Sequence, residues 1–252
     1  MLSVRNLINT TDLTADDITQ ILDTARSMEE INHRTIKKVP ALRGRTIVNL
    51  FLEASTRTRS SFEIAEKRLS ADSLNVQGSS SSVSKGECLE DTIKTLDSYG
   101  IDMFVCRARN AGTAERITQY TDARVINAGD GKHAHPTQAL LDLYTMREHF
   151  GKLEGLKVAI VGDLLHSRVV GSLAPALRTM GTRSRSWARP RSSFPSPRSS
   201  APRRRMTSTP SSRTPTSCIC SACSSSAWRV PPSPLSESTT ACGASTPSVT
   251  PA

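Results

Sequence analysis

Apolar residues recur at helical and strand spacings through the first 182 residues, and the two spacings alternate. Near the N-terminus, Thr14 precedes Asp17 at the spacing of a capped helix start. Residues 18–28 then show the apolar repeat of a helix. Farther along, β-branched and apolar runs predict buried strands at 45–52, 73–78, 102–107, 124–128 and 157–163. The predicted helices between and after them are 60–69, 87–99, 113–121, 136–150 and 167–180.

This alternation of strands and helices predicts an α/β fold in which helices flank a parallel sheet. Ligands of such sheets bind at the carboxyl ends of the strands. Polar clusters that directly follow strands are therefore the first places to look for chemistry.

Composition changes abruptly near Thr182. Residues 183–252 are mostly Ser, Pro, Arg, Thr and Ala, with ten arginines, no lysine and one acidic residue, Glu237. Almost all of the net charge of +10 therefore lies in this tail. Such a composition buries too little apolar surface to offset chain entropy, so we expect a disordered tail. Arginine-rich tails can bind nucleic acid, but Trp187, Phe194 and Trp228 are scattered rather than interleaved, so we expect no nucleic-acid partner.

Cysteine usage and hydropathy exclude several other classes. Cys88 and Cys106 are isolated and expected to be unpaired. Cys218, Cys220 and Cys223 have a spacing that could bind metal, but no histidine follows them, so we expect no metal site. The N-terminus lacks the apolar core of a signal peptide, and no apolar stretch approaches about 18 residues. The chain is therefore expected to be cytoplasmic, with no membrane partner.

The most informative polar cluster is residues 53–59 (EASTRTR), between a predicted strand and a predicted helix. Ser55, Thr56 and Thr58 offer hydroxyl donors at a helix start, where an anion is favoured. Arg57 adds a guanidinium that can bind phosphate with two hydrogen bonds. The alternative is an ordinary Ser/Thr cap with surface arginines, but the position directly after a buried strand favours a phosphate site.

Two further clusters follow strands. Arg107 ends its predicted strand, which would direct its side chain into the crevice, although a surface arginine is the alternative. His135 and Gln138 flank a helix start whose first residue is Pro136, so they could contact a carbonyl oxygen. A helix-capping histidine is the alternative, and a metal site with His133 lacks an evident third ligand.

The remaining candidates are weaker on position alone. Residues 79–87 (SSSSVSKGE), which include Ser81 and Lys85, have the composition of a mobile surface loop. Arg168 follows the strand 157–163 at a helix start, where it could bind a carboxylate. The preceding Gly–Asp resembles a nucleotide-binding turn only weakly, because G-x-G-x-x-G is absent.

Taken together, these phrases resemble the transcarbamoylase family. The strings FLEASTRTRSSFE, KGE, CR, HPTQALLD and GDLLHSRV occur in the family's order and cover nearly all of residues 1–182. They are most similar to the aspartate-specific branch. The ornithine branch shares STRTR and the histidine loop, but Glu53-Ala54 and the KGE phrase favour aspartate.

The resemblance implies a two-domain enzyme that transfers the carbamoyl group of carbamoyl phosphate to L-aspartate, an early step of pyrimidine synthesis. Residues 1–150 would bind carbamoyl phosphate, 151–182 would begin an aspartate-binding domain, and 183–252 would interrupt it. The family uses no cofactor or metal. Active sites would be shared between the chains of a homotrimer, and regulatory chains are left open as further partners.

The resemblance also implies the roles of individual residues. Carbamoyl phosphate would be bound by the side chains of Ser55, Thr56, Arg57, Thr58, Arg107, His135 and Gln138. Ser81 and Lys85 would reach into a neighbouring subunit's site, and Arg168 would hold an aspartate carboxylate. The catalytic set would be Arg57, Thr58, Lys85, Arg107 and His135.

The tail has the marks of a reading-frame slip. In GC-rich codons, residues 216–223 (TSCICSAC) can be written so that reading from the third base gives VLHLLRV. The same offset turns residues 240–245 (TACGAS) into RLWGV. One constant offset through residues 205–252 yields a helix-patterned acidic stretch, a buried strand ending in arginine, and the family phrases LRVQ and EYY. We therefore hypothesise that residues 183–252 are an out-of-frame translation of the aspartate domain, and that this chain is impaired as an enzyme.

Overall fold

The computed structural model describes residues 2–77, 87–188 and 217–220, of which 184–188 and 217–220 are described by their backbone alone. The strands are β1 (Thr46–Phe51), β2 (Asp72–Gln77), β3 (Met103–Ala108), β4 (Arg124–Asp130), β5 (Lys157–Gly162), β6 (Arg183–Ala188) and β7 (Ser217–Cys220). The α-helices are α1 (Ala15–Glu29), α2 (Thr56–Arg68), α3 (Leu89–Asp97), α4 (Thr113–Ile117), α5 (Pro136–Phe150) and α6 (Arg168–Thr179). Short 3-10 helices η1 (Thr10–Asp12) and η2 (Glu30–His33) flank α1.

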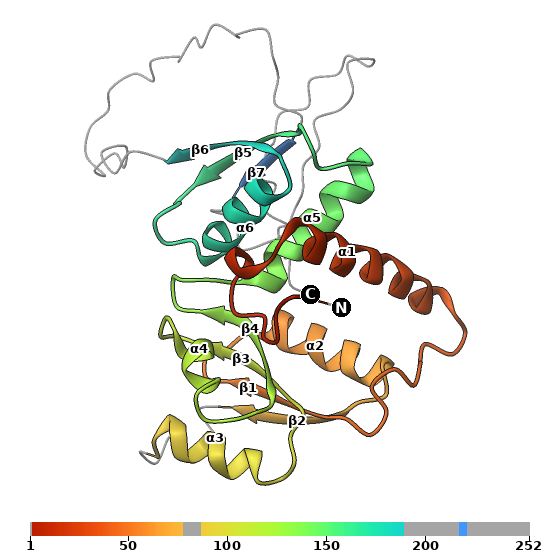
Figure 1. The fold of residues 1–252 in the computed structure, drawn as a ribbon, viewed down its shortest axis with the longest axis vertical. Helices are drawn as coiled ribbons and strands as arrows, with labels where there is room; N and C mark the ends of the chain where they lie inside the picture. Colours follow the sequence, from red (N-terminus) through yellow and green to blue (C-terminus); the bar gives the residue numbers. More distant parts are fainter. Residues whose placement is uncertain (1, 78–86, 189–216, 221–252) are drawn as a thin grey trace, which may run out of the picture.

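The described part of the first 150 residues forms a parallel sheet in the order β2-β1-β3-β4 (Figure 1). The central strands β1 and β3 are nearly continuous apolar runs because helices cover both of their faces. One face packs Val48, Leu50 and Phe104 against α3 and α4. The other packs Phe51 and Val105 near Phe62 of α2. The predicted fold class, a parallel sheet flanked by helices, is confirmed.

The predicted strands agree with the structure to within one or two residues, but two helices differ. Helix α2 begins at Thr56 rather than at residue 60. The prediction began too late because the first turn of this helix is polar and shows no apolar repeat. Helix α4 ends at Ile117 rather than at residue 121. Thr14 caps α1 as expected, since its hydroxyl accepts from the Asp17 backbone and Asp17 accepts in return.

A second parallel sheet, in the order β6-β5-β7, lies above the first in Figure 1. Its strands β6 and β7 fall within residues 183–252, where we expected disorder, so that expectation is wrong for these ten residues. Parallel pairing joins backbone groups, and a Ser-rich or Arg-rich segment can supply those without an apolar pattern. The rest of the tail lies outside the described residues.

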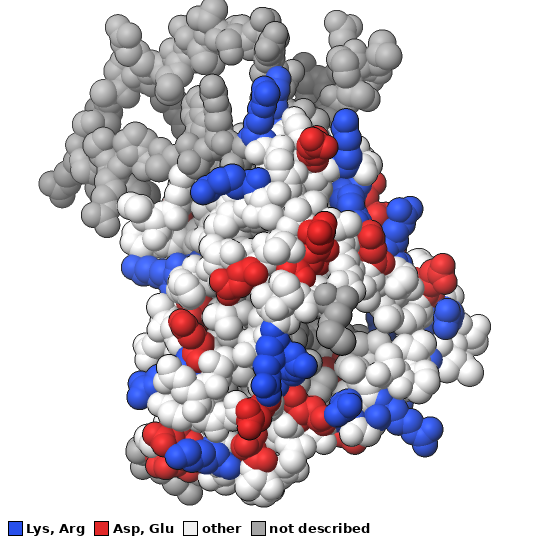
Figure 2. Space-filling model, viewed as in Figure 1, with Lys and Arg blue, Asp and Glu red and all other residues white. Residues whose placement is uncertain are grey.

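Helix α5 joins the two sheets, because it starts beside β4 and ends among the residues that cover β5 (Figure 1). Leu143 and Met146 of α5 are buried in one cluster with Leu22 of α1, Ile160 of β5 and Leu173 of α6. On the face shown in Figure 2, acidic and basic side chains are interspersed. This agrees with the near-neutral charge of residues 1–182. Among the described residues, no helix is long and apolar enough to cross a membrane.

Candidate active site

The start of α2 faces the carboxyl ends of the first sheet without a side-chain cap of its own. Ser55 occupies the N-cap position in extended conformation, but its side chain makes no capping hydrogen bond. The first turn of α2 also contains no acidic residue. The ordinary-cap interpretation of Ser55 is therefore wrong, and the positive end of the helix dipole is left to attract an anion.

Arg107 lies between α2 and β4 with only 11% of its side chain exposed. Its Nη1 donates to Thr58 Oγ1 at 3.4 Å and to the Ala128 carbonyl at 3.2 Å. The buried Nε makes no hydrogen bond with a described residue, although the Glu53 carboxylate lies 3.8 Å away. Burial lowers the pKa of this guanidinium, and the nearby Arg168 lowers it further. A buried cation with a spare donor suits an anionic ligand.

Gly129 marks the point where three predicted site residues meet. Its backbone has φ +115°, and a Cβ there would lie 3.2 Å from Arg107 Nη1, 3.3 Å from the His135 ring and 3.5 Å from Arg168 Cδ. A Cβ would therefore crowd Arg107 and His135 and touch Arg168. The glycine lets β4 end close enough for two arginines and one imidazole to share a small space.

His135 is buried, with 7% of its surface exposed. Burial, with help from Arg107 and Arg168, lowers the pKa of its imidazole to about 3. The ring is therefore neutral near pH 7 and works as a hydrogen-bonding group rather than as a general acid. Thr137 Oγ1 lies 3.3 Å from Nδ1, and in the tautomer in which this hydroxyl donates to Nδ1, the Nε2 proton is available as a donor.

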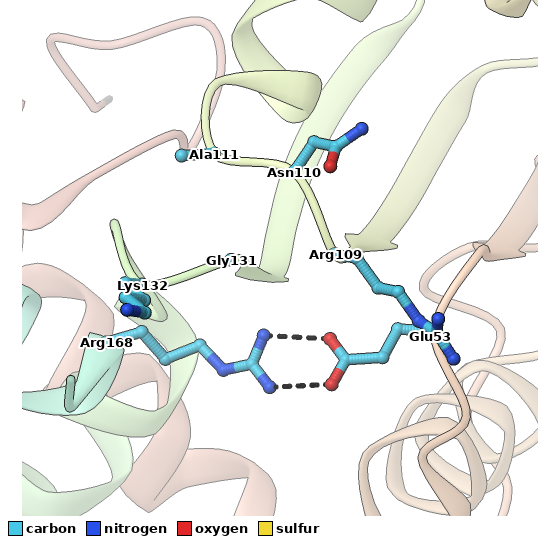
Figure 3. A pocket seen from close by; sticks show the side chains of 7 residues that line it. All are labelled: Glu53, Arg109, Asn110, Ala111, Gly131, Lys132 and Arg168. Atoms are coloured by element: carbon cyan, nitrogen blue, oxygen red, sulfur yellow. Dashed lines mark hydrogen bonds and ion pairs between the residues drawn. The ribbon is translucent and has the colours of Figure 1, made fainter.

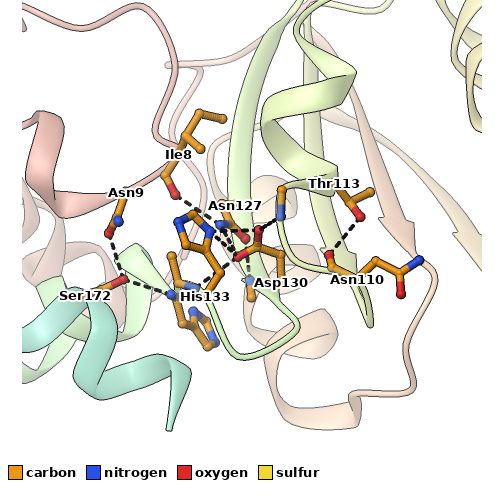
Figure 4. A network of polar contacts seen from close by, with 12 residues as sticks. Ile8, Asn9, Asn110, Thr113, Asn127, Asp130, His133 and Ser172 are labelled. Carbon is orange, nitrogen blue, oxygen red and sulfur yellow. Dashed lines mark hydrogen bonds and ion pairs between the residues drawn. The ribbon is translucent and has the colours of Figure 1, made fainter. Parts of the chain in front are cut away.

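A buried carboxylate, Asp130, holds the loops on both sides of the site (Figure 4). It accepts from the Gly112 backbone at 2.7 Å, the Asn127 amide at 2.8 Å and the Ala134 backbone at 3.1 Å. His133 Nδ1 lies 3.0 Å from the same carboxylate. His133 is therefore held by its contact with Asp130. Among the described residues, no group of three or more side chains is arranged to hold a metal.

Arg168 pairs with a carboxylate of this chain (Figure 3), and its expected contact with an aspartate carboxylate stays a prediction. Its Nη1 and Nη2 donate to the two oxygens of Glu53 at 2.9 Å and 3.1 Å. The pair lines a hollow of about 610 Å³ together with Arg109, Asn110, Ala111, Gly131 and Lys132. Sequence reasoning used Glu53 only to separate two branches of a family. Its position at a strand end was the signal that could have identified it as part of the site.

Replacing Glu53 with glutamine is expected to lower the free energy of unfolding near pH 7 by about 1 kcal/mol, because the partly exposed pair loses its charge. The hydrogen bond from Arg168 lowers the pKa of Glu53 below 4.5. The stabilisation is therefore complete above about pH 4.5 and lost as the pH falls through the lowered pKa. Urea unfolding of both proteins across this range tests it. Glu115→Gln, which removes an exposed carboxylate without an ion pair in the described part of the chain, is the control. If the unfolding free energies of the unchanged protein and of Glu53→Gln differed by the same amount at acid pH, the ion pair would not be the cause of the difference.

The structure brings together most of the residues predicted for carbamoyl phosphate. Gln138 lies in the first turn of α5, where its Nε2 donates to Asp142 Oδ1 at 3.0 Å. Thr56 and Arg57 lie in the first turn of α2. Ser81 and Lys85 lie outside the described residues. Besides Glu53, sequence reasoning missed Asp130 and Asp142, which contact predicted site residues or their loops.

Comparison with known proteins shows the family to which the chain belongs. Residues 5–148 match the model of the aspartate/ornithine carbamoyltransferase carbamoyl-P binding domain. The aspartate carbamoyltransferase catalytic subunit of Thermobifida fusca is 56% identical over 178 residues, which are 71% of this chain and 57% of the relative. The corresponding subunit of Pelotomaculum thermopropionicum is 58% identical over 168 residues, 67% of this chain and 54% of the relative.

Solved structures agree with the sequence relatives. The catalytic subunit of M. jannaschii aspartate transcarbamoylase superposes with a TM-score of 0.68 at 41% identity, covering 73% of this chain and 60% of that one. The Trypanosoma cruzi enzyme, solved with carbamoyl phosphate and aspartate, gives 0.66 at 36% identity, covering 70% and 55%. The chain thus spans little more than half the length of the proteins it matches. The chain belongs to the aspartate/ornithine carbamoyltransferase family.

Proposed function

We propose that this chain carries the carbamoyl phosphate site of an aspartate carbamoyltransferase, which makes N-carbamoyl-L-aspartate and phosphate. The observation that carries the proposal is the meeting of Arg107, His135 and Arg168 around Gly129, beside the uncapped start of α2. The phosphate would lie at that helix start, bound by Ser55, Thr56, Arg57 and Thr58. The named relatives favour aspartate over ornithine as the acceptor.

In the proposed mechanism, the neutral α-amine of aspartate attacks the carbonyl carbon of carbamoyl phosphate. A C–N bond forms, the C–O bond to phosphate breaks, and the amine proton leaves with the phosphate. Negative charge on the carbonyl oxygen would be stabilised by Thr58, Arg107 and the neutral imidazole of His135. Arg57 and the helix dipole would hold the leaving phosphate, and the positioning of two substrates would supply much of the rate.

The second substrate and the assembly form a further part of the proposal. Arg168 would bind an aspartate carboxylate in exchange for Glu53, which now occupies it. Ser81 and Lys85 would serve a neighbouring chain of a homotrimer, with or without regulatory chains. Residues 183–252 are proposed to be out of frame, so this chain would lack most of the aspartate site. Sequencing the gene around the Thr182 codon tests this, and an uninterrupted frame would contradict it.

We expect the chain as it stands to bind carbamoyl phosphate but to form little or no carbamoyl-aspartate. Calorimetric titration with carbamoyl phosphate, beside inorganic phosphate, checks the first statement, and a product assay checks the second. A version with the frame restored by one base change is expected to turn over with L-aspartate and not with L-ornithine. Failure of the unchanged chain to bind carbamoyl phosphate would overturn the proposed site. Normal turnover by the unchanged chain would overturn the proposed impairment.

A further inference from the structure

Helix α5 carries a buried carboxyl group one turn beyond Gln138. Asp142 is 6% exposed, and residues four apart on a helix lie on the same face. Gln138 Nε2 donates to Asp142 Oδ1 at 3.0 Å. Among the described residues, this is the one hydrogen bond that the Asp142 side chain receives.

Burial of the Asp142 carboxyl group is expected to lower the stability of the fold rather than to raise it. Burial raises the pKa of Asp142 to about 6, and the hydrogen bond from Gln138 opposes that rise. Near neutral pH the group is therefore still mainly ionised. A buried carboxylate with a single hydrogen bond is poorly compensated for the water it has lost. A role beyond packing would explain its presence.

The ionised carboxylate fixes which way round the Gln138 amide lies. A carboxylate only accepts hydrogen bonds, so the NH2 group of the amide must face it. A rotated amide would bring two acceptors together. The carbonyl oxygen, Oε1, consequently points away from Asp142, and no described residue donates to it. Gln138 thus offers a hydrogen-bond acceptor with a set orientation.

The same helix start carries a potential donor, because His135 is the N-cap residue of α5. Gln138 and His135 are joined through the backbone, since Gln138 N–H donates to the His135 carbonyl at 3.1 Å. The imidazole of His135 is neutral near pH 7, and its Nε2 can donate when Thr137 donates to Nδ1. A donor and an acceptor at one helix start suit the –C(=O)–NH2 end of a ligand, which presents an acceptor beside a donor.

We infer that Asp142 is a positioning residue that sets the Gln138 amide to accept from the ligand's –NH2 group, and thereby selects a phosphorylated or phosphonylated amide over the matching acid. The inference rests on the proposed function, because it places the ligand's amide end at Gln138. It deepens that function by assigning selectivity to a residue that does not touch the ligand.

Two nearly isosteric probes isolate this effect. Phosphonoacetamide ends in –C(=O)–NH2, and phosphonoacetate ends in a carboxylate, which would place an acceptor against Gln138 Oε1. We expect the unchanged chain to bind the amide more tightly than the acid in calorimetric titration. Asp142→Leu frees the Gln138 amide to turn its NH2 toward the acid, so the ratio of the two dissociation constants should fall by about tenfold.

Three companion variants separate positioning from a loss of structure. Gln138→Leu should lower the ratio as Asp142→Leu does, and the double variant should lower it no further. Asp142→Asn keeps the packing but can turn its own NH2 toward Gln138, so the ratio should fall by about threefold, and it replaces the leucine variant if that protein does not fold. Glu148→Gln removes an exposed carboxylate from the same helix and should leave the ratio unchanged.

The results separate the role of Asp142 from the proposed carbamoyl phosphate site. If Gln138→Leu lowers the ratio and both Asp142 variants keep it, the assignment of Asp142 is wrong. If the unchanged chain binds both probes equally well, the inference also fails, while the phosphate site stands. If the unchanged chain binds neither probe, the proposed function fails and the role of Asp142 falls with it.

Discussion

Replacing Arg107 with methionine is expected to weaken the binding of carbamoyl phosphate by about a hundredfold. The Arg107 side chain is 11% exposed, and its Nε makes no hydrogen bond with a described residue. A hydrogen bond to a charged group contributes about 1.5–3 kcal/mol, so the loss of one or two of them accounts for a change of this size. Calorimetric titration of the full chain measures it.

The chain should still fold without the Arg107 guanidinium, because Glu53 keeps its two hydrogen bonds with Arg168. Arg107→Lys retains the charge but not the planar fork and should recover part of the affinity. Arg116→Met is the matched control, since Arg116 bonds to Tyr120 on the surface, away from the site. Unchanged affinity in a folded Arg107→Met protein would show that the phosphate binds elsewhere.

Replacing Gly171 with alanine is expected to lower the free energy of unfolding by about 3 kcal/mol. A Cβ at this position of α6 would lie 2.3 Å from the carbonyl oxygen of His133, and neither backbone can yield without moving its element. The sign of the effect is diagnostic, because alanine in place of glycine inside a helix ordinarily stabilises by about 1 kcal/mol.

Urea unfolding of the two proteins measures this effect of Gly171→Ala. Thr179→Ala, an exposed change near the end of the same helix, should alter the free energy of unfolding by less than about 0.5 kcal/mol. The separation of α6 from the His133 loop should also disturb His135, whose backbone N–H donates to Ser172 Oγ at 2.9 Å. A Gly171→Ala protein as stable as the original would mean that α6 does not approach this loop so closely.

The order and type of the elements could be predicted because the apolar repeats are local. Strand bounds such as Thr46–Phe51 and the cap at Thr14 depend on a few neighbouring residues. The true start of α2 was missed because its first turn is polar. The polar residues of this turn form part of the candidate site, and functional sites are where a sequence most often departs from the apolar pattern of its element.

Contacts between distant residues could not be predicted in the same way. Glu53 and Arg168 are 115 positions apart, and their pairing depends on how two sheets are placed by α5. Asp130 and Asp142 look like ordinary acidic residues in the sequence, because burial is a property of the fold. The strands β6 and β7 were missed because composition predicts packing of side chains and not the pairing of backbones.

The place of β5 between β6 and β7 also governs how this chain behaves in concentrated solution. Both β6 and β7 pair with β5 through backbone hydrogen bonds, and such bonds depend little on which side chains the strands carry. Whenever either neighbour detaches, β5 presents an unpaired edge that can template a strand from another molecule. Colloidal stability of the chain therefore depends on ten residues of a segment that contributes no predicted side chain to the active site.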